Sequence, residues 1–244
     1  MIQLVAPMST VSLAELDTVA LLNRIDKKYV LNEQQLLQII PVIQLHYKVL
    51  SIDGHRIFTY ENNYFDTPNL QFYYDHHNGY TNRMKVRSRR YKETNTSFFE
   101  IKKKENVDRT AKTRERVSQL VQTIDDNTKA MVQCFSRKSL VDLELKLNNN
   151  FNRITFVNHA QTERMTLDFN IQFSDEYTQK NFSNFYVLEI KQSKSNGRSV
   201  ITETLKKNNV REQSFSKYIF GVIALKDHVR KNNFLPLIKK INKL

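Results

Sequence analysis

The chain has 244 residues, 40% of them hydrophobic, and carries a formal net charge of +13 with an isoelectric point near 9.7. This composition is typical of a globular protein with a sizeable core and excludes wholesale disorder. The single cysteine, Cys134, excludes an internal disulfide and a cysteine-based zinc site, and the positive charge predicts an acidic partner: nucleic acid, an anionic membrane surface or a phosphate-rich small molecule.

The predicted elements mix strands and helices along the whole chain. The spacing of Ser12 and Glu15 is that of a capping box and predicts a helix through about Leu22. No linker rich in proline or glycine interrupts the chain, so we predict one domain over residues 1–244. The other predicted elements are a strand at 24–31, a helix at 33–40 ended by Pro41, a hairpin at 48–60 turning at Asp53-Gly54, a strand at 63–66, a helix at 67–78, long strands from about 82 and about 98, one or two helices within 125–146, strands at 152–157, 163–173 and 185–192, helices at 199–208 and 214–231, and a basic amphipathic helix at 234–244.

Several predicted strands carry polar, mostly basic side chains on one face and apolar side chains on the other. Successive residues of a strand point to opposite sides, so residues two apart share a face. The residues that share the polar faces are Arg83, Lys85, Arg87, Arg89 and Tyr91; Glu100, Lys102 and Lys104; Arg164, Thr166, Asp168, Asn170 and Gln172; and Glu189 with Lys191.

Two architectures satisfy this alternation. One is an ordinary sheet whose polar face lies in water. The other is a closed barrel whose polar faces point inward while helices cover its apolar outside. A barrel would concentrate the positive charge in a tunnel and strengthen its field on an anionic substrate.

Motifs for covalent or zinc chemistry are poorly represented. With four glycines the chain has no Walker loop and no dinucleotide fingerprint. His76 and His77 are adjacent in a predicted helix and point apart, which gives little support for a metal site, and Cys134 fits an apolar helical pattern as a small core residue.

The basic strand faces suit a polyphosphate, because arginine and lysine supply the fixed donors that such an anion needs and carboxylates supply ligands for a divalent ion. Phosphoryl transfer requires mainly positioning and electrostatics, so no nucleophile is needed. Solvated surface charge and simple ion pairing stay open as alternatives, as does a nucleic-acid-binding barrel.

Seven motifs in this order resemble a known family: RIDKKYV at 24–30, YFDT at 64–67, KVRSRRY at 85–91, FEIK at 99–102, ERMTLD at 163–168, VLEIK at 187–191 and FSKY at 215–218. From about residue 13 to 229 the chain resembles the catalytic domain of the vacuolar transporter chaperone (VTC) polyphosphate polymerases. These belong to the triphosphate tunnel metalloenzymes, which include the CYTH proteins.

The resemblance implies an α+β fold: a closed antiparallel β-barrel, the triphosphate tunnel fold, with helices packed around its outside. It implies transfer of the terminal phosphate of ATP to a growing polyphosphate chain, with Mn²⁺ or Mg²⁺ as cofactor and ATP with inorganic polyphosphate or pyrophosphate as partners. Nucleic acid is disfavoured as a partner. The sequence shows no signal-peptide pattern and no apolar run of membrane-spanning length, so we expect a cytoplasmic protein, with attachment to a membrane-protein partner left open.

The resemblance also implies roles for individual residues. The expected metal ligands are Glu189 and, as a second candidate or as a partner of a tunnel lysine, Glu100. The expected catalytic residues are Arg87, Arg89, Lys102, Arg164 and Lys217. The expected phosphate-binding residues are Lys28, Arg87, Arg89, Lys102, Lys104, Arg153, Arg164, Lys191, Ser216 and Lys217.

One departure from the superfamily affects the predicted reaction. The triphosphatase branch carries Glu-x-Glu-x-Lys on its first acidic strand, whereas this chain has Phe98 at the first glutamate of that pattern. Fewer acidic ligands favour the polymerase. Two alternatives stay open: a tunnel triphosphatase acting on tripolyphosphate or a nucleoside triphosphate, and a non-enzymatic barrel that binds polyphosphate or nucleic acid.

Overall fold

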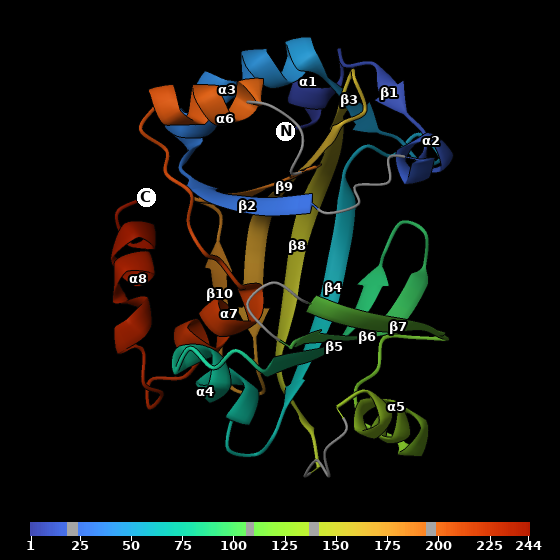
Figure 1. Cartoon of the computed structure of the whole chain (residues 1–244), viewed down its shortest axis with the longest axis vertical. Coiled ribbons are helices and arrows are strands. Elements are labelled where there is room, and N and C mark those ends of the chain that lie inside the picture. Colours follow the sequence, from blue (N-terminus) through green and yellow to red (C-terminus); the bar gives the residue numbers. More distant parts are fainter. Residues whose placement is uncertain (19–23, 106–109, 137–141, 194–198) are drawn as a thin grey trace.

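A computed structural model describes residues 1–18, 24–105, 110–136, 142–193 and 199–244 (Figure 1). Its strands are β1 (Thr10–Val11), β2 (Arg24–Leu31), β3 (Tyr47–Leu50), β4 (Phe58–Asp66), β5 (Arg83–Tyr91), β6 (Thr96–Lys104), β7 (Thr110–Val117), β8 (Glu144–Asn158), β9 (Glu163–Ser174), β10 (Gln179–Phe182) and β11 (Tyr186–Ser193). Its helices are α1 (Ile2–Val5), α2 (Leu13–Thr18), α3 (Glu33–His46), α4 (Gln71–His77), α5 (Asp126–Ser136), α6 (Val200–Lys207), α7 (Lys217–Leu225) and α8 (Leu235–Ile241), with a 3₁₀ turn at Asn232–Phe234.

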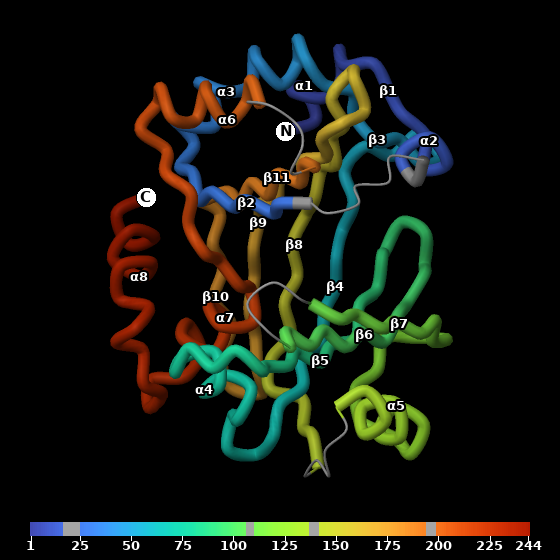
Figure 2. The backbone as a smooth tube through the Cα atoms, in the orientation of Figure 1, coloured from blue at the N-terminus to red at the C-terminus, as the bar shows by residue number. Residues whose placement is uncertain are grey.

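The strands form one curved sheet in the order β2-β11-β9-β8-β4-β5-β6-β7, with every pair along this path antiparallel. The long strands β4, β8 and β9 run along the molecule, while β2 and β11 cross at one end and β5, β6 and β7 at the other (Figures 1 and 2). The predicted α+β antiparallel fold is confirmed. The sheet is barrel-like, and no pairing among the described residues joins β7 to β2.

Helices cover the outside of this sheet, as the alternation of its strands requires. The apolar side chains of Met165, Leu167, Leu188 and Ile190 lie in one core cluster with residues of α1, α3 and α6. A second cluster joins α4, α7 and α8 to the other strands, and it includes Val30 and Val187, which alternate with the outward-facing Leu31 and Leu188, so α7 packs on the inner face of the sheet. Packing of α1, α3 and α6 therefore covers the outer apolar face, while the inner face carries the polar side chains and, beside α7, apolar ones such as Phe151 and Val187.

Helix α3 corrects the prediction that Pro41 ends a helix at Ile40. The helix continues to His46 with Pro41 inside it. Proline forfeits one backbone hydrogen bond, but buried Ile39 and Ile43 on either side of it pack into the core and hold the helix together. The predicted N-terminus is confirmed, because Asn32 and Gln35 form a capping box.

The predicted hairpin over 48–60 is wrong in its strand partners. Asp53 and Gly54 do form a tight turn with φ of 49° and 79°, closed by a bridge between Ile52 and His55. However, β3 pairs with β8 and β1, and β4 pairs with β5 and β8. Turn chemistry is local, whereas strand partners are chosen across the whole sheet.

Other differences concern boundaries. The strand predicted at 63–66 is the end of β4, the helix predicted from Thr67 begins at Gln71, and the helix predicted over 214–231 spans Lys217–Leu225. Cys134 is exposed, which corrects its assignment to the core. The segment 125–146 holds one helix and the start of β8 within the described residues, and the predicted end of the first helix near Leu22 lies outside them. None of the helices in the described part of the chain is both long and apolar enough to cross a membrane.

Candidate active site

A cavity of about 590 Å³ lies inside the curve of the sheet. Ten cationic and four acidic side chains line it, together with polar and apolar residues. The charged residues that line the cavity are Asp26, Lys28, Lys85, Arg87, Arg89, Glu100, Lys102, Lys112, Arg114, Arg153, Asp168, Glu189, Lys191 and Lys217. They come from β2, β5, β6, β7, β8, β9, β11 and the first turn of α7.

Most of the predicted phosphate-binding residues meet in this cavity. Lys28, Arg87, Arg89, Lys102, Arg153, Lys191, Ser216 and Lys217 line it, as do Glu100 and Glu189. Lys104 and Arg164 lie on β6 and β9 but are not among the lining residues.

The cavity also contains charged residues to which the sequence analysis gave no role. They are Asp26, Lys85, Lys112, Arg114 and Asp168. Lys85 and Asp168 occupy the predicted polar faces, so the alternation was a signal that could have found them. Lys112 and Arg114 come from β7, where period-two spacing places them on one face as well.

Glu100 is held by arginines. Its Oε2 lies 2.6 Å from Nε of Arg87, directly opposite it in the ladder of β5 and β6, and 4.0 Å from Nε of Arg89. Burial alone would raise the pKa of Glu100, but the two arginines outweigh burial and lower it. Nε of Arg89 also donates to Oδ1 of buried Asn62 at 2.8 Å, which fixes this guanidinium on the cavity wall.

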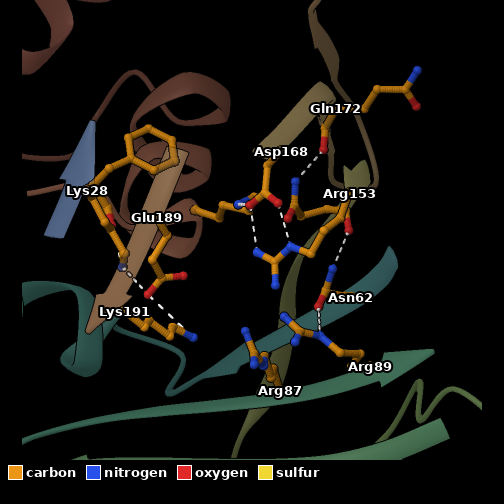
Figure 3. A network of polar contacts seen from close by, with 12 residues as sticks. Lys28, Asn62, Arg87, Arg89, Arg153, Asp168, Gln172, Glu189 and Lys191 are labelled. Carbon is orange, nitrogen blue, oxygen red and sulfur yellow. Dashed lines mark hydrogen bonds and ion pairs between the residues drawn. The ribbon is translucent and has the colours of Figure 1, made fainter. Parts of the chain in front are cut away.

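Glu189 stands between two lysines at longer distances. Its Oε1 lies 3.9 Å from Nζ of Lys28 and 3.8 Å from Nζ of Lys191 (Figure 3). Burial opposes its ionisation, but Lys191, Lys28 and Arg153 together lower the pKa of Glu189 to about 2. This carboxylate is therefore ionised at neutral pH.

Asp168 is the most enclosed acid of the cavity, at 2% exposure. Its two oxygens accept from Nε and Nη2 of Arg153 at 2.5 and 2.7 Å (Figure 3). One of these oxygens also pairs with Nζ of Lys217. Burial would raise the pKa of Asp168, but these two cations hold it well below its usual range.

The cavity lysines lie close to one another. Burial, with Lys112 and Lys28 nearby, lowers the pKa of Lys102 to about 8. Burial likewise lowers the pKa of Lys217 to about 8, although Asp168 acts in the opposite direction. Nζ of Lys85 donates to Oγ of Ser216 at 2.8 Å, and burial, followed by the nearby Lys102, holds the pKa of Lys85 well below its usual value. An anion in the cavity would relieve this repulsion.

The fold places α7 so that its first turn faces the cavity. Oγ of Ser216 caps the helix by accepting from the amide of Ile219, and Nζ of Lys28 donates to the carbonyl of Phe215 at 3.3 Å. Deeper in the core, the Tyr218 hydroxyl donates to buried Asp66, which also accepts backbone amides of α4. Lys217 therefore lies between two fixed points of the chain, the contact of Phe215 with Lys28 and the contact of Tyr218 with Asp66.

The carboxylates of the cavity differ in how readily their oxygens could bind a metal ion. Within residues 1–18, 24–105, 110–136, 142–193 and 199–244, no three or more His, Cys, Asp or Glu side chains form a group that could hold a metal ion. Glu100 and Asp168 are in direct contact with arginines. Glu189 keeps more than 3.5 Å from both lysines, so its oxygens fit a divalent ion whose remaining ligands come from phosphate.

The histidine pair lies in α4 and has structural contacts. Nε2 of His77 lies 2.8 Å from Oδ1 of Asn232, and both histidine rings pack near Phe234. Burial, together with Lys85, Arg83, Lys104 and Lys28, lowers the pKa of His76 to about 3.

Comparison with solved structures finds similar chains at low identity. A candidate adenylate cyclase from Vibrio parahaemolyticus is 15% identical over 81% of this chain and 97% of its own, with a TM-score of 0.47. One from Bacillus halodurans is 12% identical over 80% and 96%, with a TM-score of 0.49. A candidate adenylyl cyclase from Hippeastrum, described as having a dominant triphosphatase activity, is 12% identical over 83% and 97%, with a TM-score of 0.49.

Comparison with curated proteins finds no match. Comparison with protein families finds one that spans most of the chain: the VTC domain model matches residues 23–226. This range contains every strand that lines the cavity and the whole of α7. The chain therefore belongs to the VTC domain family.

Proposed function

We propose that the chain is a polyphosphate polymerase, which transfers the terminal phosphate of ATP to a growing inorganic polyphosphate chain inside the cavity. The observation that carries this proposal is the enclosure of ten arginine and lysine side chains around about 590 Å³ of space. A polyphosphate has about one negative charge for each phosphoryl unit, and only such a density of donors replaces its hydration.

The cationic side chains divide into two kinds of donor. Arg87, Arg89 and Arg153 are fixed by hydrogen bonds to Glu100, Asn62 and Asp168, so they offer planar donors in set orientations. The lysines, Lys28, Lys102, Lys191 and Lys217 among them, act as point charges around the chain. Arg164 and Lys104, outside the lining, would act only on phosphates beyond the cavity.

A divalent cation, Mn²⁺ or Mg²⁺, would be held by Glu189 together with oxygens of the substrate phosphates. When bound, it neutralises charge that develops on the transferring phosphoryl group. The protein's own part is to align the two phosphate chains, to exclude water and to stabilise the transition state with Arg87, Arg89, Lys102 and Lys217.

One position on β6 favours the polymerase over a triphosphatase, because it carries Phe98 and not the acidic residue of the triphosphatase pattern. Phe98, at the position where the triphosphatase pattern has a glutamate, lies opposite Arg89 and Arg116 in the sheet, and its ring lies 4.9 Å from the guanidinium carbon of Arg114. An arginine over an aromatic ring stays free to meet an anion, whereas a glutamate there would neutralise it.

A turnover assay tests the proposal. Purified protein is incubated with ATP, Mn²⁺ and a trace of pyrophosphate, and the products are resolved on a gel while free phosphate is measured by colorimetry. Long phosphate polymers that depend on Mn²⁺ are expected. Release of free phosphate without polymers would contradict the polymerase and support a triphosphatase. Salt-sensitive binding of polyphosphate without any turnover would contradict both enzymes and support a polyphosphate-binding protein without catalytic activity.

A further inference from the structure

We propose that Asp168 is a positioning residue that holds Arg153 and Lys217 at a fixed spacing for phosphoryl transfer. This inference rests on the proposed function and adds to it a residue that does not itself contact substrate. The observation behind it is the bridge formed by one buried carboxylate between a guanidinium on β8 and an ammonium on the first turn of α7.

The bridge leaves Arg153 with donors that point elsewhere. Asp168 takes Nε and Nη2, one side of the guanidinium fork, so the N–H groups of Nη1 remain for another acceptor. The guanidinium is also confined by aromatic rings, with its central carbon 4.8 Å from the centre of Tyr60 and 5.2 Å from that of Phe151. It therefore has one orientation, and it lines the cavity.

Lys217 is confined by the same carboxylate. Its ammonium pairs with Asp168 and lies 4.2 Å from the ring centre of Phe151, the ring that also faces Arg153. Its side chain is 11% exposed, so an unpaired ammonium there would shift away or lose its proton. Asp168 thus keeps the helix-borne charge next to the sheet-borne one.

A positioning role makes opposite predictions for binding and for turnover. Removal of the carboxylate takes one negative charge from the cavity, so a polyanion should bind as well or better. The two cations would no longer be aligned, so turnover should fall about tenfold to a hundredfold. A variant that merely folds badly would lose binding sites and turnover in parallel.

The test compares Asp168→Asn with Asp168→Glu and with Asp175→Asn. Asparagine keeps the shape and removes the charge, while glutamate keeps the charge and shifts it by one methylene. Asp175→Asn is the matched control, because Asp175 pairs with Lys226 at 3.3 Å and neither residue lines the cavity. Each protein is measured for kcat, KM, the Mn²⁺ concentration at half-maximal rate, and the affinity for tripolyphosphate from pH 6.5 to 9.5.

For Asp168→Asn we expect a lower kcat, unchanged or tighter tripolyphosphate binding, an unchanged Mn²⁺ requirement, and loss of binding at a lower pH than in the wild type. The shift follows because Asp168 raises the pKa of Lys217. An unchanged kcat would overturn the proposal, as would a fall of kcat and binding capacity together. A higher Mn²⁺ requirement would instead make Asp168 a metal ligand and overturn it too.

The proposal can still be tested if Asp168→Asn does not fold or if the wild type shows no turnover. If Asp168→Asn does not fold, Asp168→Glu decides, with reduced kcat and retained affinity expected and wild-type kcat contradicting the proposal. If the wild type itself shows no turnover, the proposed function fails, and Asp168 is judged on binding alone: an unshifted pH dependence in the Asn variant overturns its role.

Discussion

The two sides of the cavity differ in how their charges are compensated. On the side formed by β2, β8, β9, β11 and the start of α7, which we call the balanced wall, the cations Lys28, Arg153, Lys191 and Lys217 are accompanied by Asp26, Asp168 and Glu189. On the side formed by β5, β6 and β7, the electropositive wall, the cations Lys85, Arg87, Arg89, Lys102, Lys112 and Arg114 are accompanied by one acid, Glu100.

This difference suggests that the two walls have different roles in binding the substrate. An acid in contact with a cation fixes the orientation of that cationic side chain but reduces the net attraction of the wall for an anion, as Asp168 does with Arg153. A wall with one acid for six cations attracts a polyanion along its length but holds fewer of its groups in one orientation. The balanced wall would therefore hold the reacting phosphates in one orientation, while the electropositive wall would bind the chain and also direct Arg87, Arg89 and Lys102 at the transferring phosphate.

The largest effect is expected on the balanced wall, from Glu189→Gln. Metal-dependent turnover should fall by at least about a hundredfold, because an amide cannot replace a carboxylate beside a divalent ion and a transferring phosphate. The rate of polymer formation across a Mn²⁺ series measures this. Tripolyphosphate affinity should not fall, because a negative charge has been removed. Glu144→Gln, in a surface pair with Lys146, is the control, and wild-type turnover in Glu189→Gln would remove this residue from the mechanism.

The second test changes the packing of α7 against the strands of the balanced wall. A Cβ at Gly221 of α7 would lie 2.6 Å from Cδ1 of Phe173 and 3.0 Å from Cδ2 of Leu147. Gly221→Ala should therefore lower the free energy of unfolding by about 1–3 kcal/mol through overpacking, measured by urea denaturation. Helix propensity alone predicts a gain of about 1 kcal/mol, so a more stable variant would show that α7 can move away from the sheet.

The electropositive wall is tested by Lys102→Met. Loss of one charged donor should weaken tripolyphosphate binding by about tenfold and make the affinity less sensitive to salt. Calorimetric titration at several ionic strengths measures both. Lys129→Met is the matched control, since Lys129 is a surface lysine paired with Asp142 outside the cavity. An equal loss in both variants would mean that net charge, and not the wall, governs binding.

The smallest effect concerns pH. Lys102 and Lys217 both have a pKa lowered to about 8, and a bound anion favours their charged forms. Affinity should therefore be highest well below pH 8 and decrease as the pH rises through 8, by about twofold per lysine at pH 8 itself. Binding near pH 8 should also take up protons, which titrations in buffers of different ionisation enthalpy detect. A flat profile from pH 6.5 to 9 would contradict these lowered pKa values.

Much of the site could be predicted because it depends on local periodicity. Arg87, Arg89, Glu100, Lys102 and Glu189 were placed on one side of their strands by period-two spacing, and all of them line the cavity. The same spacing placed Asp168, but nothing in the sequence showed that it bridges Arg153 and Lys217. That contact joins three elements, and its atoms meet only after β8, β9 and α7 have packed.

The limits of periodicity are visible within β9. The apolar odd positions pack under α3 and α6 as far as Phe169, but Ile171 and Phe173 belong to the other core cluster, beside α7. Between them Asn170 adopts a left-handed φ of 50°, and the register with β8 shifts between Asn150 and Asn152. A bulge of this kind changes the face of the sheet to which the following side chains point, and the hydrophobic pattern of the sequence does not reveal it.

By itself the sequence determined the strand faces, the helix caps and the concentration of positive charge, because these depend on side chains within a few residues of one another. The tertiary structure decided that β3 and β4 each pair with β8 and not with each other, which acid meets which cation, and that Glu189 keeps a distance from its lysines while Glu100 contacts Arg87 directly. Those outcomes depend on sheet curvature and on contacts between residues far apart in the chain, which no local pattern encodes.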